Sequence, residues 1–223
     1  MKLFYYNLSL EIKLSNDKLN ALVVENGNEL DKLVLAINKR VVKKGSQIEL
    51  FEDLDKLEFH KFVDVLYSPI DITFDKKDIQ KRLLLDLVEE IESRELIENF
   101  IEARTKFIDA IENLKIDSDY NFDIDANIGV DSFLKSFDIR LKEPEGDFSE
   151  RLIEYMGNVH RLLGKKVFIL VACKGYVNQS ELKFIKEYAE YQGLKILFID
   201  SNSFSLPEIV EEYIIDSDVC EIY

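Results

Sequence analysis

Three segments near the C-terminal end of the chain decide its fold: KVFILVA at residues 166–172, QSELKFIKEYAEY at 179–191 and LKILFID at 194–200. The first and third are continuous apolar runs, short enough to be buried strands, and the second carries its apolar residues at helical spacing. A strand, a helix and a second strand in this order predict parallel pairing. The sequence therefore predicts an α/β fold.

The same alternation is found earlier in the chain. Residues 19–24 form a short apolar run that predicts a strand, Asn26-Gly27-Asn28 breaks it, and residues 29–42 then have helical spacing. Loose alternation over residues 3–12 predicts a hairpin that turns at Asn7. The remaining predicted elements are strands at 48–51 and 62–67, a helix at 148–163, a short helix at 207–215 and a last strand at 219–223.

A long helical segment separates the two halves of this α/β pattern. Residues 76–115 are almost free of helix breakers, and a single helix of that length would be about 60 Å long. The segment either breaks near Ser93-Arg94 or projects as an arm whose apolar stripe needs a partner. We therefore predict a head domain from residues 1–75 and 145–223, and a helical leg with an acidic loop at 76–144.

Composition limits the possible functions. The 223 residues include 29 basic and 44 acidic side chains, a net charge of −15. Such a chain repels anionic membranes and nucleic acid unless its charges are segregated or screened. It has no apolar run of about 18 residues, no signal peptide and two cysteines, of which Cys173 is expected to be a buried thiol. These features predict a cytoplasmic protein without a membrane span.

The junction between the strand at 19–24 and the following helix is where a phosphate-binding loop would lie. The G-x-x-x-x-G-K-[ST] motif is absent there, although residues 195–200 resemble a Walker B strand that ends at Asp200. His60 and His160 lie in no recognisable catalytic motif. We therefore predict a nucleotide-binding-like α/β head with an emptied phosphate loop, and no enzymatic activity.

An acidic segment follows the long helical stretch. It begins DSDYN at residues 117–121, like the opening of an EF-hand loop, but Phe122 replaces the required glycine and Ile128 the required glutamate. No basic residue lies between Ile116 and Leu134. The segment is either a solvated acidic loop or a Ca²⁺ site, with four candidate ligands: Asp117, Asp119, Asp123 and Asp125.

Basic residues are grouped separately from these acids. One group ends the helix predicted at 29–42 and the other follows the acidic segment; they consist of Lys39, Arg40, Lys43 and Lys44, and of Lys135, Arg140 and Lys142. The first group either complements the dipole of its helix or forms a patch that contacts phosphate groups.

Together these patterns resemble a known family, the small ring-forming spacer-acquisition protein of type II-A CRISPR loci. The resemblance rests on residues 166–171, the helix that contains Glu181-Leu182, residues 194–200, residues 114–120 and the strand at 19–24. It covers nearly the whole chain, except that the spacing between Tyr120 and Asp131 is longer than expected.

The resemblance implies a homotetrameric ring, stabilised by calcium, that threads linear double-stranded DNA without sequence preference and works with other CRISPR adaptation proteins. Bound calcium and inward-facing cations would also account for DNA binding by a chain of charge −15. The alternatives are a metal-dependent nuclease that uses the aspartates at 117–125, and an oligomeric scaffold that does not bind nucleic acid.

Overall fold

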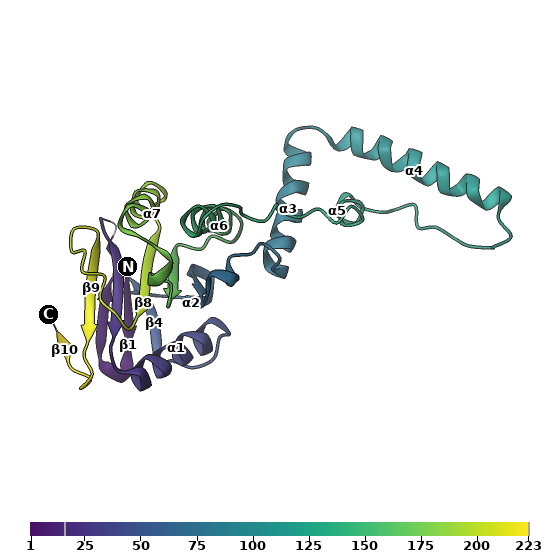
Figure 1. The fold of residues 1–223 in the computed structure, drawn as a ribbon. Coiled ribbons are helices and arrows are strands. Elements are labelled where there is room, and N and C mark those ends of the chain that lie inside the picture. Colours follow the sequence, from purple (N-terminus) through teal and green to yellow (C-terminus); the bar gives the residue numbers. More distant parts are fainter. Residues whose placement is uncertain (16, 223) are drawn as a thin grey trace. The chain divides into compact units, whose positions relative to one another are not determined.

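The computed structural model describes residues 1–15 and 17–222, without the side chains of Asp117 and Ile222. The chain divides into two compact units, one of residues 1–73 and 143–223 and the other of residues 74–142 (Figure 1). The boundaries predicted from the sequence, after residues 75 and 144, lie close to these. The first unit is a mixed α/β domain, so the predicted fold class is confirmed.

A six-stranded sheet forms the centre of the first unit, in the order β10-β9-β3-β8-β7-β6. The five strands from β9 to β6 are parallel, and only the short β10 is antiparallel to its neighbour. All residues of β3 and β7 are buried, as expected for parallel strands covered on both faces. The bounds are β3 Leu19–Val24, β6 Val63–Leu66, β7 Val167–Val171, β8 Lys195–Asp200, β9 Val210–Ile215 and β10 Glu221–Ile222.

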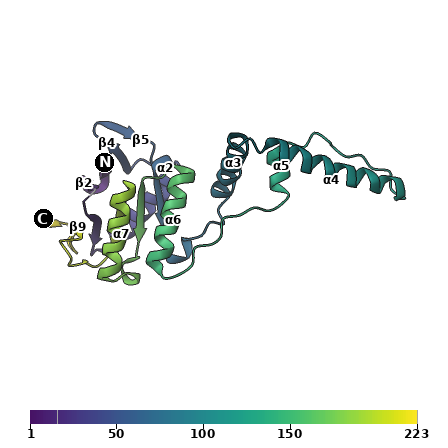
Figure 2. The ribbon, with the colours of Figure 1, turned by 90° about the horizontal axis from the view of Figure 1, so that it is seen from above.

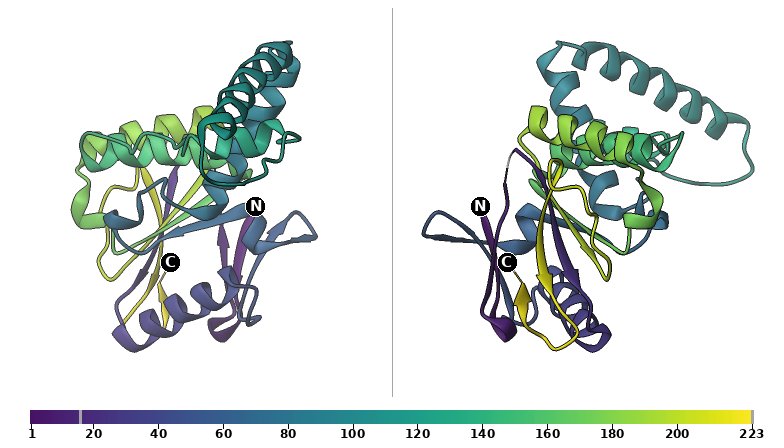
Figure 3. Two further views of the ribbon diagram at one scale, coloured as in Figure 1. Left: turned by 90° about the vertical axis from the view of Figure 1, so that its right-hand side faces the viewer. Right: turned by 60° about the vertical axis from the view of Figure 1, so that its left-hand side comes forward.

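Helices cover both faces of this sheet. Figure 3 shows α6 (Phe148–Leu163) and α7 (Gln179–Gln192) on one face and α1 (Gly27–Val41) on the other, and Figure 2 shows α6 and α7 side by side. Capping boxes at Asp147 and Asn178 begin α6 and α7 by satisfying their first backbone amides. The capping boxes therefore define the residues at which α6 and α7 begin.

A smaller antiparallel sheet, β2-β1-β4-β5, packs on the same side as α1. The predicted hairpin is confirmed, since Lys2 pairs with Lys13 and Tyr5 with Leu10. Buried residues of this sheet share one core with α1 and the six-stranded sheet. The bounds are β1 Lys2–Tyr5, β2 Leu10–Lys13, β4 Ile48–Glu52 and β5 Asp55–Leu57, with a short α2 at Phe59–Phe62 and 3₁₀ turns at Tyr6–Leu8, Pro69–Asp71 and Lys174–Tyr176.

The second unit consists of α3 (Lys77–Ser93), α4 (Ile97–Asp117) and α5 (Val130–Lys135). The helical segment therefore breaks, as one of the two interpretations predicted, and the break contains Glu95 in a left-handed conformation. Phe133 of α5 packs edge-on against Phe100 and Phe107 of α4. No helix in the described part of the chain is long and apolar enough to cross a lipid bilayer.

One predicted element is wrong. Residues 207–215 were expected to form a helix, but Val210–Ile215 is strand β9, which pairs in parallel with β3 from Leu19 to Val24. The segment carries β-branched and aromatic residues, which favour strands, and its acidic residues masked that preference. Pairing with the central strand of the sheet decides its structure.

The turn between α7 and β8 depends on Gly193, whose φ of 68° is left-handed. Its amide donates to Glu190 O and the next amide, of Leu194, to Ala189 O at 2.8 Å, which closes the helix. We predict that Gly193→Ala lowers the free energy of unfolding by about 1 kcal/mol, because an L residue is strained there. Gly175→Ala, at ordinary φ with open space around the added Cβ, is the control and should be neutral in urea unfolding.

Candidate functional site

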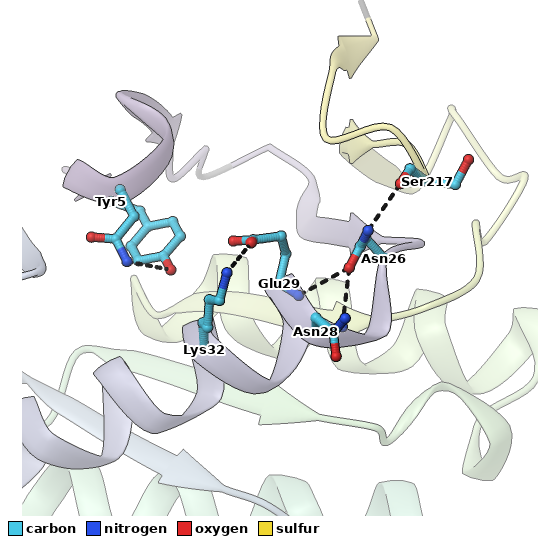
Figure 4. Close-up of polar contacts among 7 residues, drawn as sticks. Tyr5, Asn26, Asn28, Glu29, Lys32 and Ser217 are labelled. Carbon is cyan, nitrogen blue, oxygen red and sulfur yellow. Dashed lines mark hydrogen bonds and ion pairs between the residues drawn. The ribbon is translucent and has the colours of Figure 1, made fainter.

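The junction between β3 and α1 is controlled by Asn26 (Figure 4). Its side-chain oxygen accepts hydrogen bonds from the amides of Asn28 and Glu29, at 3.0 and 3.2 Å. Its side-chain nitrogen donates to the carbonyl of Ser217 at 2.9 Å, in the turn after β9. Amides that would face a phosphate group at a helix N-terminus are therefore already bonded within the chain.

The charges around this junction are also unsuited to an anion. Glu25 and Glu29 flank it, and Glu29 pairs with Lys32 at 2.5 Å, which raises the pKa of Lys32 above its ordinary value. Asp200, at the end of β8, accepts a hydrogen bond from the Ser201 amide at 2.8 Å and so closes its own turn. The Asn28 and Glu29 amides and the Lys32 ammonium are already engaged within the chain, which leaves the junction poorly suited to a nucleotide phosphate. Whether the head descends from a nucleotide-binding fold stays a prediction.

The acidic segment begins where α4 ends, at Asp117, whose side chain lies outside the described residues. The other three predicted ligands, Asp119, Asp123 and Asp125, are exposed. Asp123 lies 3.7 Å from the Lys115 ammonium, and Asp125 accepts a hydrogen bond from the Asn127 amide at 2.8 Å. Among the described residues, no three His, Cys, Asp or Glu side chains converge on a point that could hold a metal ion.

Asp131 belongs to α5 instead of the loop. Its carboxylate pairs with Lys135 at 3.0 Å, and this hydrogen bond is the main cause that lowers the pKa of Asp131. The described aspartates that remain in the loop, Asp119, Asp123 and Asp125, carry the hard carboxylate oxygens that Ca²⁺ prefers as ligands. Their chemistry fits calcium, whereas their separate positions do not form a coordination sphere.

The first predicted basic group lies in the last turn of α1 and just after it. Lys39, Lys43 and Lys44 are exposed. Arg40 differs from them, because its guanidinium donates to the Gly45 carbonyl at 3.3 Å and its charge helps to lower the pKa of buried Glu49. The lysines are therefore better placed than Arg40 to contact an external anion.

The second predicted basic group lies in the helical unit and is engaged with acids. Lys135 pairs with Asp131, and Arg140 lies 3.0 Å from Asp138 and 3.8 Å from Asp75, which raises the pKa of Arg140. Lys142 is exposed. A phosphate would have to displace these acids before it could bind Lys135 or Arg140.

His160 and Cys173 occupy structural positions. His160, at the end of α6, has its Nδ1 2.6 Å from the carbonyl of Lys165. Cys173 is buried as predicted, and burial raises the pKa of its thiol to about 12. His60 lies beside Glu58 in a group of charges that sequence reasoning did not assemble, because its members are far apart in the chain.

Comparison with known proteins identifies the family. Residues 42–219 match the family model described as CRISPR-associated protein (Cas_Csn2). The chain belongs to this family. The resemblance inferred from the sequence is therefore confirmed at the level of the Csn2 family.

Solved structures agree at the level of the fold. The crystal structure of Stu0660 of Streptococcus thermophilus superposes with a TM-score of 0.60, and the match covers all of this chain and 76% of that one at 13% identity. No curated protein sequence matches the chain significantly. A Csn2-family protein with a mixed α/β domain and an inserted helical unit is thus established.

The structure of the β3–α1 junction predicts how its residues respond to substitution. Asn26→Ala should lower the free energy of unfolding by about 1 kcal/mol, because the first amides of α1 lose their acceptor. Gly27→Ala should be neutral or slightly stabilising, since a Cβ meets nothing within 4 Å there. Urea unfolding measures both changes in stability. The same measurement with added ATP tests whether the junction binds a nucleotide, and a gain in stability with ATP would contradict our description of it.

Proposed function

We propose that this Csn2-family protein acts in CRISPR adaptation by binding linear double-stranded DNA without sequence preference, and that it catalyses no reaction. Family membership over residues 42–219 carries this proposal. The exposed lysines at the end of α1 support it, since phosphate contacts from lysine need no particular base sequence. Its partners are duplex DNA, further copies of the chain and other CRISPR adaptation proteins.

The proposed assembly is a homotetrameric ring. The helical unit supports it, because α4 exposes large apolar side chains that water disfavours: Ile101, Phe107, Leu114 and Ile116 are between 45% and 80% exposed. Exposed apolar side chains of this size are stabilised when another subunit covers them.

Calcium is the proposed ligand of the acidic segment. Asp119, Asp123 and Asp125 supply carboxylates within one short loop, together with Asp117 at the end of α4. Because like charges repel, these groups come together only when a cation compensates them. Calcium would supply that compensation and so couple the shape of the loop to the assembly of the ring.

A metal-dependent nuclease is the alternative for the same aspartates. Two-metal hydrolysis needs carboxylates held on rigid elements around both ions. Here Asp123 and Asp125 lie in an irregular loop, and neither is held toward the other. The arrangement therefore favours structural calcium over catalysis.

The first test concerns assembly. We expect a tetramer in calcium by light scattering after size-exclusion chromatography, and a smaller species after chelation. Changing Asp117 and Asp119 to Ala together should weaken calcium binding at least tenfold by calorimetry, because two charged ligands are lost. Asp109→Ala, an exposed position within α4, is the matched control. A calcium-indifferent monomer would contradict both the ring and its metal site.

The second test concerns DNA topology. A ring that threads DNA requires a free end, so linear duplex should compete for binding much better than covalently closed circles at equal base-pair concentration. Log affinity should fall with log salt by about 0.9 for each phosphate contacted. Equal competition by closed circles would show that the DNA is bound without threading.

A further inference from the structure

The direction of the parallel strands brings separate basic segments to one edge of the first unit. His60 and Lys61 precede β6, and Lys165 precedes β7, so these residues lie where parallel strands begin. Helix α1 follows β3 and packs against β6 and α2, which places Lys43 at the same edge. Four basic side chains from three distant segments are thereby grouped, and we call them the amino-edge cluster.

Contacts hold this cluster in place. The Lys165 ammonium donates to the carbonyls of His60 and Val63, the second at 3.0 Å, and the Lys165 carbonyl is bonded to His160 of α6. Lys43 has a left-handed φ of 61°, and its amide bonds back to the Arg40 carbonyl at 3.1 Å. The backbone that carries these cations is therefore fixed before any ligand binds.

One carboxylate, that of Glu58, lies among these groups. Its Oε1 is 2.7 Å from Lys61 Nζ, and its Oε2 is 3.7 Å from His60 Nε2. The hydrogen bond from Lys61 is the largest cause that lowers the pKa of Glu58, and the charges of His60 and Lys43 add to it. The neighbouring cations thus stabilise a negative charge at the position of Glu58, whose side chain is 58% exposed and able to move away.

Of the side chains in the amino-edge cluster, His60 is the one whose ordinary pKa lies nearest to neutral. Burial, followed by the charge of Lys43, lowers the pKa of His60; Lys165 and Lys61 lower it further, and Glu58 opposes them. A phosphate bound here would add negative charge and raise the pKa of His60 again. Binding would then take up a proton.

Most charged side chains that follow the carboxyl ends of the strands are acidic, although Lys174 follows β7. Acids follow the carboxyl ends of the strands: Glu25 after β3, Asp71 after β6, Asp200 at the end of β8 and Asp216 after β9. A polyanion is therefore disfavoured at that edge and attracted to the amino-edge cluster. The net charge of −15 is therefore a poor guide to the local electrostatic potential at the amino-edge cluster.

We propose that Lys43, His60 and Lys61 form a phosphate-binding site for the DNA backbone, with Glu58 as an internal counter-ion that the phosphate displaces. The site rests on the proposed function, and it names residues on which DNA binding depends. Lys165 is a positioning residue, which fixes the backbone of His60 and contributes charge.

The test uses the full-length protein with calcium and a fluorescent linear duplex, followed by anisotropy. Lys61→Ala should weaken binding several-fold and reduce the salt slope by about 0.9 for each subunit whose site contacts DNA. Glu58→Gln should have the opposite effect and tighten binding several-fold, because the competing carboxylate is lost. Lys183→Ala, an exposed lysine on α7, is the matched control and should bind like the wild type.

The pH dependence provides an independent readout. Wild-type affinity should rise as the pH falls toward and below about 6.5, because the pKa of His60 in the free protein is lowered from that ordinary value. His60→Gln should lose most of that rise. If the wild type binds DNA and these variants bind it equally well, the proposed site is wrong and the proposed function is unaffected. A wild-type protein that binds no duplex under any of these conditions would overturn the proposed function, and the site with it.

Discussion

Burial of the central parallel sheet on both faces is the constraint on which the rest of this molecule depends. Every residue of β3 and β7 is buried, so the strands offer no polar side chains to a ligand along their length. Charged side chains are therefore absent from β3 and β7, and many lie at the two ends of the strands and in the segments that join them. The parallel direction then sorts these segments, since all the amino ends of β6, β7, β8, β3 and β9 lie at one edge. Sheet topology, more than any single motif, determines where the chain can bind a charged partner.

The sheet was predictable because its strands are short apolar runs bounded by breakers, as at residues 166–172 and 194–200. Strand β9 was not, because Glu208, Glu211 and Glu212 give residues 207–215 an amphipathic pattern that also suits a helix. Only the pairing with β3 decides between a helix and a strand for this segment, and that pairing joins segments almost two hundred positions apart. The break in the helical insert was easier to find, since the apolar stripe changes phase close to Glu95, where the backbone turns left-handed.

Candidate sites were likewise predictable only where their residues lie close together in the sequence. The aspartates at 117–125 and the lysines at 39–44 are visible as local runs, whereas the structure shows which of them already have partners. Lys135 with Asp131 is a helical pair four residues apart, which the sequence could have indicated. The group around His60 could not be found in this way, because it joins the end of α1, the start of β6 and the loop before β7. Such a site exists only once the sheet has brought those segments together.

Charge segregation also bears on how an acidic protein can bind DNA at all. At about 0.15 M salt, electrostatic interactions are largely screened beyond about 8 Å, so a phosphate responds to the nearest cations more than to the total charge. Acids that follow the carboxyl ends of the strands would then keep DNA away from that edge, whereas the amino-edge cluster would attract it. The same acids have a cost, because copies of the chain repel each other wherever their acidic segments approach. A divalent cation bound at the loop after α4 would relieve that repulsion where subunits meet, and leave the amino-edge cluster as the surface that selects a polyanion.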